Sequence, residues 1–160
     1  MKKFVLAFTI GTVLLAGNET VAQSDLMQSY TERRQLMFDM QAALWPMFEI
    51  KNGESAKLSE AAEGARALSE ALSKAVTLFP AGTAKGEIPY TRAKPEIWSD
   101  AAGFEAAAEA LKVAAASVQQ AADAGDSEAF NVRFAALIEA CTGCHDLKPS
   151  GGGKYRHPLH

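Results

Sequence analysis

The feature that most constrains this chain is the segment Cys141-Thr142-Gly143-Cys144-His145. It holds the only two cysteines of the sequence, and the spacing C-x-x-C-H is that of covalent haem attachment. In such a segment each thiol bonds one haem vinyl group and the imidazole binds the iron. Only 15 residues follow His145, so the preceding chain has to build the pocket. The sequence therefore predicts one haem c, bound through Cys141 and Cys144 and ligated by His145.

Three other uses of the cysteine pair are weaker. On a helix, residues i and i+3 point outward from one face, and a disulfide between them would close a very short loop that stabilises little. A structural zinc ion usually takes four ligands, and the sequence has no second cysteine pair. A thioredoxin-like pair needs a βαβ context, and no such pattern surrounds this one.

The N-terminus has the pattern of an export signal. Lys2 and Lys3 precede an apolar stretch of about 14 residues, and Thr20-Val21-Ala22 offers small residues for cleavage. A retained membrane anchor is the alternative, but the stretch is shorter than the ~20 residues of a spanning helix. We therefore predict a signal peptide over residues 1–22, export to the bacterial periplasm, and no stable membrane insertion of the mature chain.

The net charge of the predicted mature chain limits the kinds of molecule that it can bind. Removing residues 1–22 leaves 138 residues with 14 basic and 18 acidic side chains, a net charge of −4. Nucleic-acid binding would require a basic surface, so it is not expected. An acidic carrier docks more readily on basic proteins, and we expect unidentified redox proteins as partners.

The remaining chain has helical periodicity and no convincing strand pattern. Apolar residues recur every three or four positions in four stretches, and Pro46 should bend the end of the first. Short connections favour an all-α, antiparallel four-helix bundle with the haem attached to the last helix. The four stretches cover residues 25–50, 55–79, 95–122 and 128–146. The first starts at Asp25, and Ser55 is expected to cap the second.

Two segments fall outside these helices. A loop of about 16 residues after Pro80 is expected to be an ordered crossover that packs on the bundle. The helical domain is placed at residues 23–148. Residues 149–160, rich in glycine and polar side chains, are predicted to form a flexible C-terminal tail. Its His157 and His160 are expected to be solvated.

The sixth coordination position of the iron decides what such a haem does. Met37 lies at the centre of the apolar stripe of the first helix, where its sulfur could reach the iron or could simply fill the core. Arg33 lies one turn earlier on the same face. Burying an arginine on an apolar stripe is unfavourable without a partner, and a haem propionate is the partner we expect.

Four motifs resemble the class II c-type cytochromes, the cytochrome c prime family, over essentially the whole predicted mature chain. The first and last motifs carry most of the resemblance. They are Arg33-Arg34-Gln35-Leu36-Met37, Lys85-Gly86-Glu87-Ile88-Pro89-Tyr90, Pro95-Glu96-Ile97-Trp98 and Cys141-Thr142-Gly143-Cys144-His145-Asp146.

The resemblance implies several roles. Leu36-Met37 is similar to the low-spin, six-coordinate branch of the family, in which a methionine is the distal ligand. Met40, about 60° around the helix, is the alternative ligand. Trp98 resembles the aromatic residue near the haem, although it could be ordinary core. Homodimers are also implied. The family's aromatic-cation pair just after the ligand is missing, because Lys148 and Pro149 occupy those positions and Tyr155-Arg156 comes only later. Either the tail loops back or Lys148 supplies the cation.

Three functions remain open on this basis. The first is a periplasmic mono-haem electron carrier with His145 and Met37 as axial ligands. The second is a five-coordinate haem protein that binds nitric oxide or carbon monoxide. The third is a small redox or disulfide module without haem. No acid-base pair or nucleophile constellation stands out, so an enzyme is not expected.

Overall fold

The computed structural model describes residues 16–148 and 151–159. The leader prediction concerns residues 1–22, of which residues 1–15 lie outside this part, and cleavage after Ala22 stays a prediction. Six helices follow one another along the chain, and the described residues add two isolated β-bridges but no strand. The helices are α1 (Ala16–Ala43), α2 (Trp45–Lys51), α3 (Leu58–Ala75), α4 (Glu96–Ser99), α5 (Ala101–Asp123) and α6 (Ser127–Thr142).

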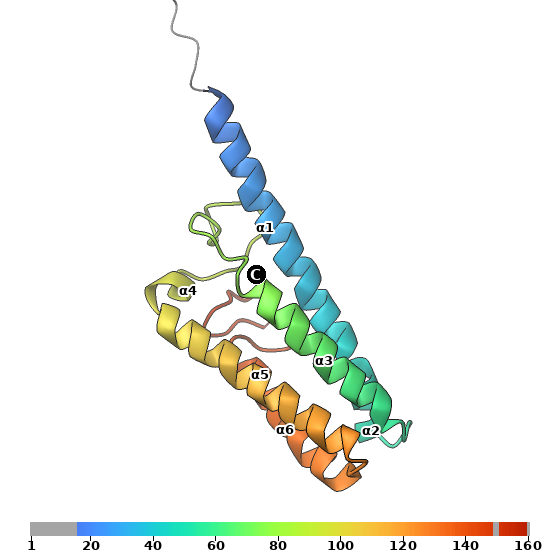
Figure 1. The fold of residues 1–160 in the computed structure, drawn as a ribbon. Coiled ribbons are helices and arrows are strands. Elements are labelled where there is room, and N and C mark those ends of the chain that lie inside the picture. Colours follow the sequence, from blue (N-terminus) through green and yellow to red (C-terminus); the bar gives the residue numbers. More distant parts are fainter. Residues whose placement is uncertain (1–15, 149–150, 160) are drawn as a thin grey trace, which may run out of the picture.

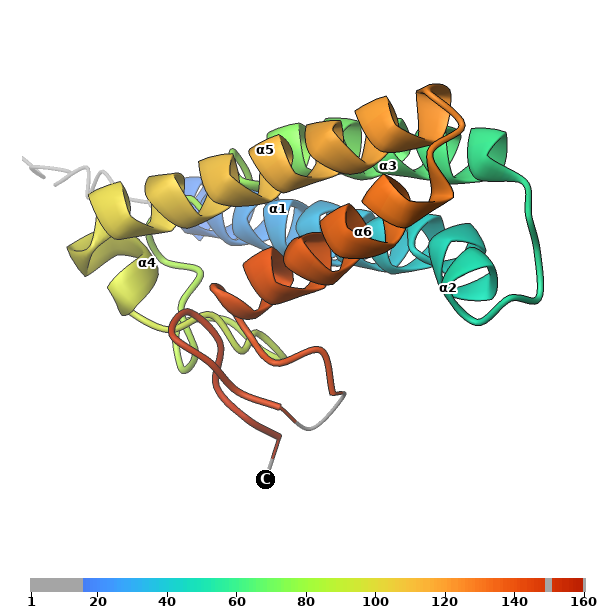
Figure 2. The ribbon, with the colours of Figure 1, turned by 90° about the horizontal axis from the view of Figure 1, so that it is seen from below.

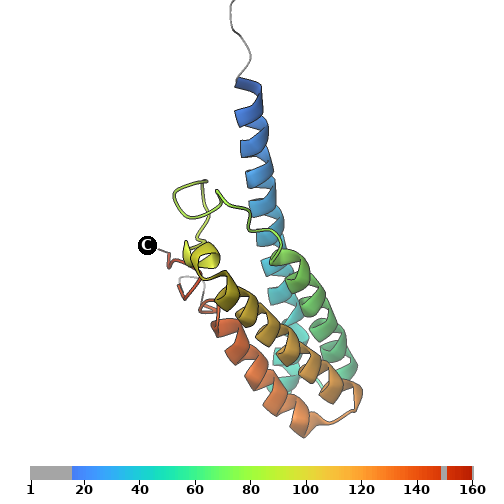
Figure 3. The same cartoon turned by 60° about the vertical axis from the view of Figure 1, so that its left-hand side comes forward.

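The four long helices α1, α3, α5 and α6 form the predicted antiparallel bundle (Figure 1). Close backbone contacts run from α1 to α3, from α3 to α5 and from α5 to α6. The N-terminal part of α1 projects beyond the other helices (Figure 3). Within the described residues, no helix combines the length and the apolar character needed to cross a membrane.

The helix boundaries differ from those predicted. α1 starts before residue 25, α3 ends before residue 79 and α6 ends before residue 146. At three further places the structure shows the cause. The first stretch breaks at Leu44, where Pro46 opens α2, as expected of a residue that lacks a backbone donor. The second helix starts at Leu58, because Ser55 caps a turn ahead of it by accepting from the amide of Lys57 at 3.2 Å. The third stretch is divided at Asp100, whose carboxylate accepts from the Gly103 amide and caps α5.

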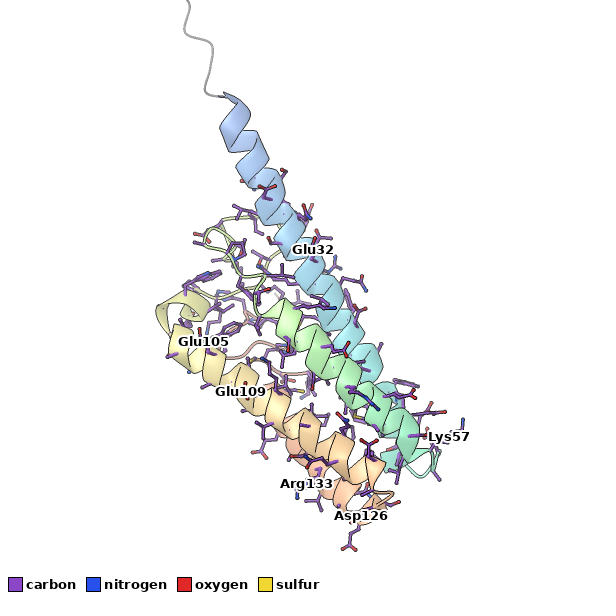
Figure 4. The ribbon with its side chains drawn as sticks, viewed as in Figure 1. Glu32, Lys57, Glu105, Glu109, Asp126 and Arg133 are labelled. Carbon is purple, nitrogen blue, oxygen red and sulfur yellow. The ribbon has the colours of Figure 1, made fainter. Side chains whose placement is uncertain are left out.

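Two apolar clusters hold the fold. The main cluster fills the bundle with small and aliphatic side chains of α3 and α5 and with aromatic rings of α6. Its tight packing needs Gly64, since a Cβ there would lie 2.5 Å from the Ala43 carbonyl oxygen of α1. The second cluster lies at the other end, where Ala93, Ile97 and Tyr155 are buried. Charged side chains cover the outer faces of the helices, as Glu32, Glu105, Glu109 and Arg133 show (Figure 4).

The crossover between α3 and α4 is ordered, as predicted, and buries Thr83, Ile88 and Thr91. The prediction of a flexible C-terminal tail was wrong for residues 151–159, the part of the tail that the structure describes. Residues 151–159, which we call the strap, run back along the crossover rather than away from the bundle (Figure 2). Tyr155 of the strap is only 3% exposed. The glycines suggested flexibility, but here they permit close packing.

Candidate haem site

The two cysteines lie at the end of α6, where the helix gives way to a turn. The C-cap is Gly143, and the amides of Cys144 and His145 reach back to the Cys141 carbonyl at 3.3 and 3.4 Å. Cys141 packs against the main cluster, whereas Cys144 packs against the second cluster. The pair therefore spans the boundary between the two apolar clusters, as a flat apolar group held by both sulfurs requires.

Both cysteine side chains are half-buried free thiols. Burial raises the pKa of Cys141 to about 11, and it also raises the pKa of Cys144. At neutral pH both thiols are therefore protonated, unlike the low-pKa cysteine of a disulfide oxidoreductase. Within the described residues, no three histidine, cysteine or acidic side chains gather as a metal site would require. The thiols are suited to a covalent apolar partner rather than to a bare ion.

His145 has a defined tautomer. Its Nδ1 lies 3.0 Å from the Asp146 carbonyl oxygen, which can only accept, so Nδ1 carries the proton and Nε2 keeps its lone pair. Burial lowers the pKa of His145, and this keeps the imidazole neutral. A neutral ring with a hydrogen-bonded outer nitrogen is the usual state of a metal-binding histidine. The geometry thus leaves Nε2 available for iron.

Met37 lies in the middle of α1, where it is half-buried and packs against the main cluster together with Cys141. Met40, the alternative ligand, is buried inside that cluster. Trp98 packs against the second cluster, as Cys144 also does, and its indole N–H donates to the Phe79 carbonyl at 3.0 Å. The structure thus places Met37 and Trp98 in the same clusters as the cysteines. Their roles toward haem stay predictions.

Arg33 has partners that the sequence did not reveal. Although it is only 5% exposed, its guanidinium donates to both oxygens of Thr83, to Thr91 Oγ1 and to the Leu78 carbonyl, at 2.8–3.1 Å. It also stacks on the Phe79 ring at 4.5 Å. Burial lowers the pKa of Arg33 to about 10, which leaves it charged at neutral pH. These acceptors explain its burial without a propionate, and contact with a propionate stays a prediction.

The strap adds residues that sequence reasoning left out. Arg156 donates to the Asp146 carbonyl, directly after the predicted ligand His145, and Arg92 of the crossover donates to the Gly151 carbonyl at 2.6 Å. Tyr155 meets the Phe104 ring edge-on at 5.2 Å and donates from its hydroxyl to Asp100 at 3.2 Å. The one sequence signal for this arrangement was the Tyr155-Arg156 pair after three glycines.

Comparison with known proteins agrees with this geometry. The family model for cytochrome c′ matches residues 28–147, three quarters of the chain. The chain belongs to the cytochrome c′ family.

Individual relatives of this cytochrome c′ family member support the assignment. The cytochrome c′ of Rhodospirillum rubrum is 30% identical over 127 residues, which cover 79% of this chain and 85% of that protein. The cytochrome c′ of Rubrivivax gelatinosus is 43% identical over 81 residues, and that match spans 50% of this chain and 61% of the relative. A nitric oxide complex of a cytochrome c prime mutant from Alcaligenes xylosoxidans superposes with a TM-score of 0.69 at 25% identity, covering 82% of this chain and 96% of the other.

The residues present fit one covalent haem c. Two protonated thiols and a neutral imidazole lie on one turn between two apolar clusters. Nearby, the buried Arg156 Nε has no acceptor among the described residues, so a further acceptor could be accommodated there. The protein is therefore a haem c protein of the cytochrome c′ family, and its two cysteines are consistent with the C-x-x-C-H motif. Attachment through Cys141 and Cys144 and ligation by His145 stay predictions.

Proposed function

We propose that this cytochrome c′ is a periplasmic carrier of one electron, with His145 and Met37 as the two axial ligands. Haem iron supplies the redox chemistry, and the protein sets its coordination and surroundings. The observation that carries the proposal is the position of Met37, half-buried on α1 and packed on the same cluster as Cys141. A thioether at that position would fill the coordination sphere, which favours electron transfer over ligand binding.

The test is a pair of volume-conserving variants. In the wild type we expect a low-spin spectrum that carbon monoxide does not change. Met37→Leu should become high-spin and bind carbon monoxide, because leucine keeps the packing but has no sulfur. Met40→Leu, one turn along the same helix, is the matched control and should remain low-spin. A low-spin Met37→Leu protein together with a high-spin Met40→Leu protein would assign the ligand to Met40 instead.

A second candidate is a gas-binding haem protein with an open distal position. It is favoured by one observation, which is that a solved structure of similar fold holds nitric oxide. A wild-type spectrum that is high-spin and responds readily to carbon monoxide would select this function. In that case Met37 would be a core methionine rather than a ligand.

Location and partners belong to the same proposal. The N-terminal pattern of residues 1–22 supports export to the periplasm, and the net charge of −4 after its removal supports a redox partner with a basic docking surface. A homodimer is supported by exposed aromatic rings on consecutive helices. Phe38 of α1 is 50% exposed and Trp45 of α2 is 68% exposed.

A further inference from the structure

The strap is bonded on both sides. On the side of the haem ligands, the Tyr155 amide donates to the Cys144 carbonyl at 3.1 Å, and the Asp146 amide donates to the Gly152 carbonyl at 2.7 Å. On the side of the crossover, the Lys94 amide donates to the Tyr155 carbonyl at 3.1 Å. The His157 amide donates to the Arg92 carbonyl at 2.8 Å. The backbone around His145 is thus fixed to the crossover through the strap.

Gly151 and Gly153 of the strap have no room for a side chain. A Cβ on Gly153 would lie 2.5 Å from the Cα of His145 and 2.7 Å from the Cys144 carbonyl oxygen. A Cβ on Gly151 would overlap the side chain of Asp146. Neither glycine has a positive φ, so backbone conformation alone does not demand glycine here. These positions lack a side chain because the strap rests directly on the backbone of the haem ligand.

One carbonyl oxygen collects two donors. The Asp146 oxygen accepts from His145 Nδ1 at 3.0 Å and also from Arg156 Nη2. A carbonyl that already accepts from a guanidinium is a weaker acceptor for the imidazole, so the Nδ1–H bond is less polarised. An imidazole with a less polarised N–H donates less electron density to iron, and this favours the reduced state.

We propose that the strap is a positioning element for His145 that fixes the ring through the Asp146 carbonyl and raises the reduction potential of the haem through Arg156. Gly153 sets the approach of the strap, and Arg156 supplies the second donor. The inference needs only the haem attached at Cys141 and Cys144. It does not depend on Met37, so it holds for a six-coordinate or a five-coordinate iron and can fail independently of the proposed function.

The first test compares reduction potentials of haem-loaded proteins with Arg156→Gln, Arg156→Lys and Arg66→Gln. Arg156→Gln should lower the potential and slow the solvent exchange of the His145 Nδ1 proton, seen by NMR, because the Asp146 carbonyl then accepts more strongly from the ring. Arg156→Lys keeps the charge and should restore part of both properties. Arg66 is exposed on α3, so Arg66→Gln makes the same change of charge far from the ring and should alter neither. Equal shifts for Arg156→Gln and Arg66→Gln would overturn the proposal.

The second test leaves every charge in place. Gly153→Ala should displace the strap from His145, take the Arg156 donor away from the Asp146 carbonyl and lower the potential. Gly125→Ala is the control, because its φ of +70° makes it a destabilising substitution at the α5–α6 turn. It should reduce stability and leave the potential unchanged. A wild-type potential in Gly153→Ala would refute the positioning role, and if that variant does not assemble, the Arg156 series decides.

Discussion

The two ends of the bundle are built on different principles. At the end with the α2–α3 and α5–α6 turns, helices bury apolar faces in the main cluster. At the end that carries His145, few apolar residues are fully buried, and side chains donate instead to the backbone of the crossover and the strap. Packing thus fixes one end, whereas polar contacts fix the other. Polar contacts therefore gather around His145, whereas apolar packing holds the far end of the bundle.

The largest loss of stability is expected from a core substitution at the end of the bundle that is held by apolar packing. Phe130 is fully buried and stacks on Phe134 with a centroid distance of 5.7 Å. Phe130→Ala should lower the free energy of unfolding by about 3–5 kcal/mol, because it removes apolar contacts and leaves a cavity. Urea unfolding measures this change. Val132→Ala on the exposed face of the same helix should stay within about 0.5 kcal/mol of the wild type.

At the polar end, Arg33→Gln should lower the free energy of unfolding by less than Phe130→Ala does. Removing the guanidinium leaves buried acceptors of Thr83 and Thr91 without their donor, at about 1–3 kcal/mol for an unsatisfied group. Amide hydrogen exchange should speed up in the crossover, residues 78–91, and remain slow in the middle of α5. Arg34→Gln, an exposed neighbour, is the control. Faster exchange spread evenly over the bundle would contradict the separation of the two ends.

The smallest effect is expected at Asp100, which joins the strap to α5. A hydrogen bond from Lys154 and a second from Tyr155 hold the pKa of Asp100 below its usual value. A carboxyl with a lowered folded-state pKa stabilises the fold above the unfolded value, roughly 3.9, and loses that contribution as pH falls through the folded value. Asp100→Asn should therefore lower stability at neutral pH and narrow its difference from the wild type in acid. A difference that stays constant from pH 6 to pH 2 would exclude this linkage.

Much of the fold follows from local pattern. Apolar spacing predicted the four bundle helices, and Pro46 predicted the break before α2. The start of α3 was displaced because Ser55 caps a turn rather than the helix itself. Periodicity reports which face of a helix is buried, but it does not report how a glycine-rich segment packs on another loop. That is why the strap was predicted as a flexible tail.

The sequence by itself determined the cofactor, because C-x-x-C-H specifies covalent haem attachment wherever it stands in a helical chain. It also determined the four bundle helices, since their apolar stripes are local. Only the tertiary structure decided the surroundings of His145 and the partners of Arg33. The acceptors of Arg33 lie 45 to 58 residues away in the sequence. They, and the Arg156 donor at the Asp146 carbonyl, come within hydrogen-bond distance only after the crossover and the strap have folded together.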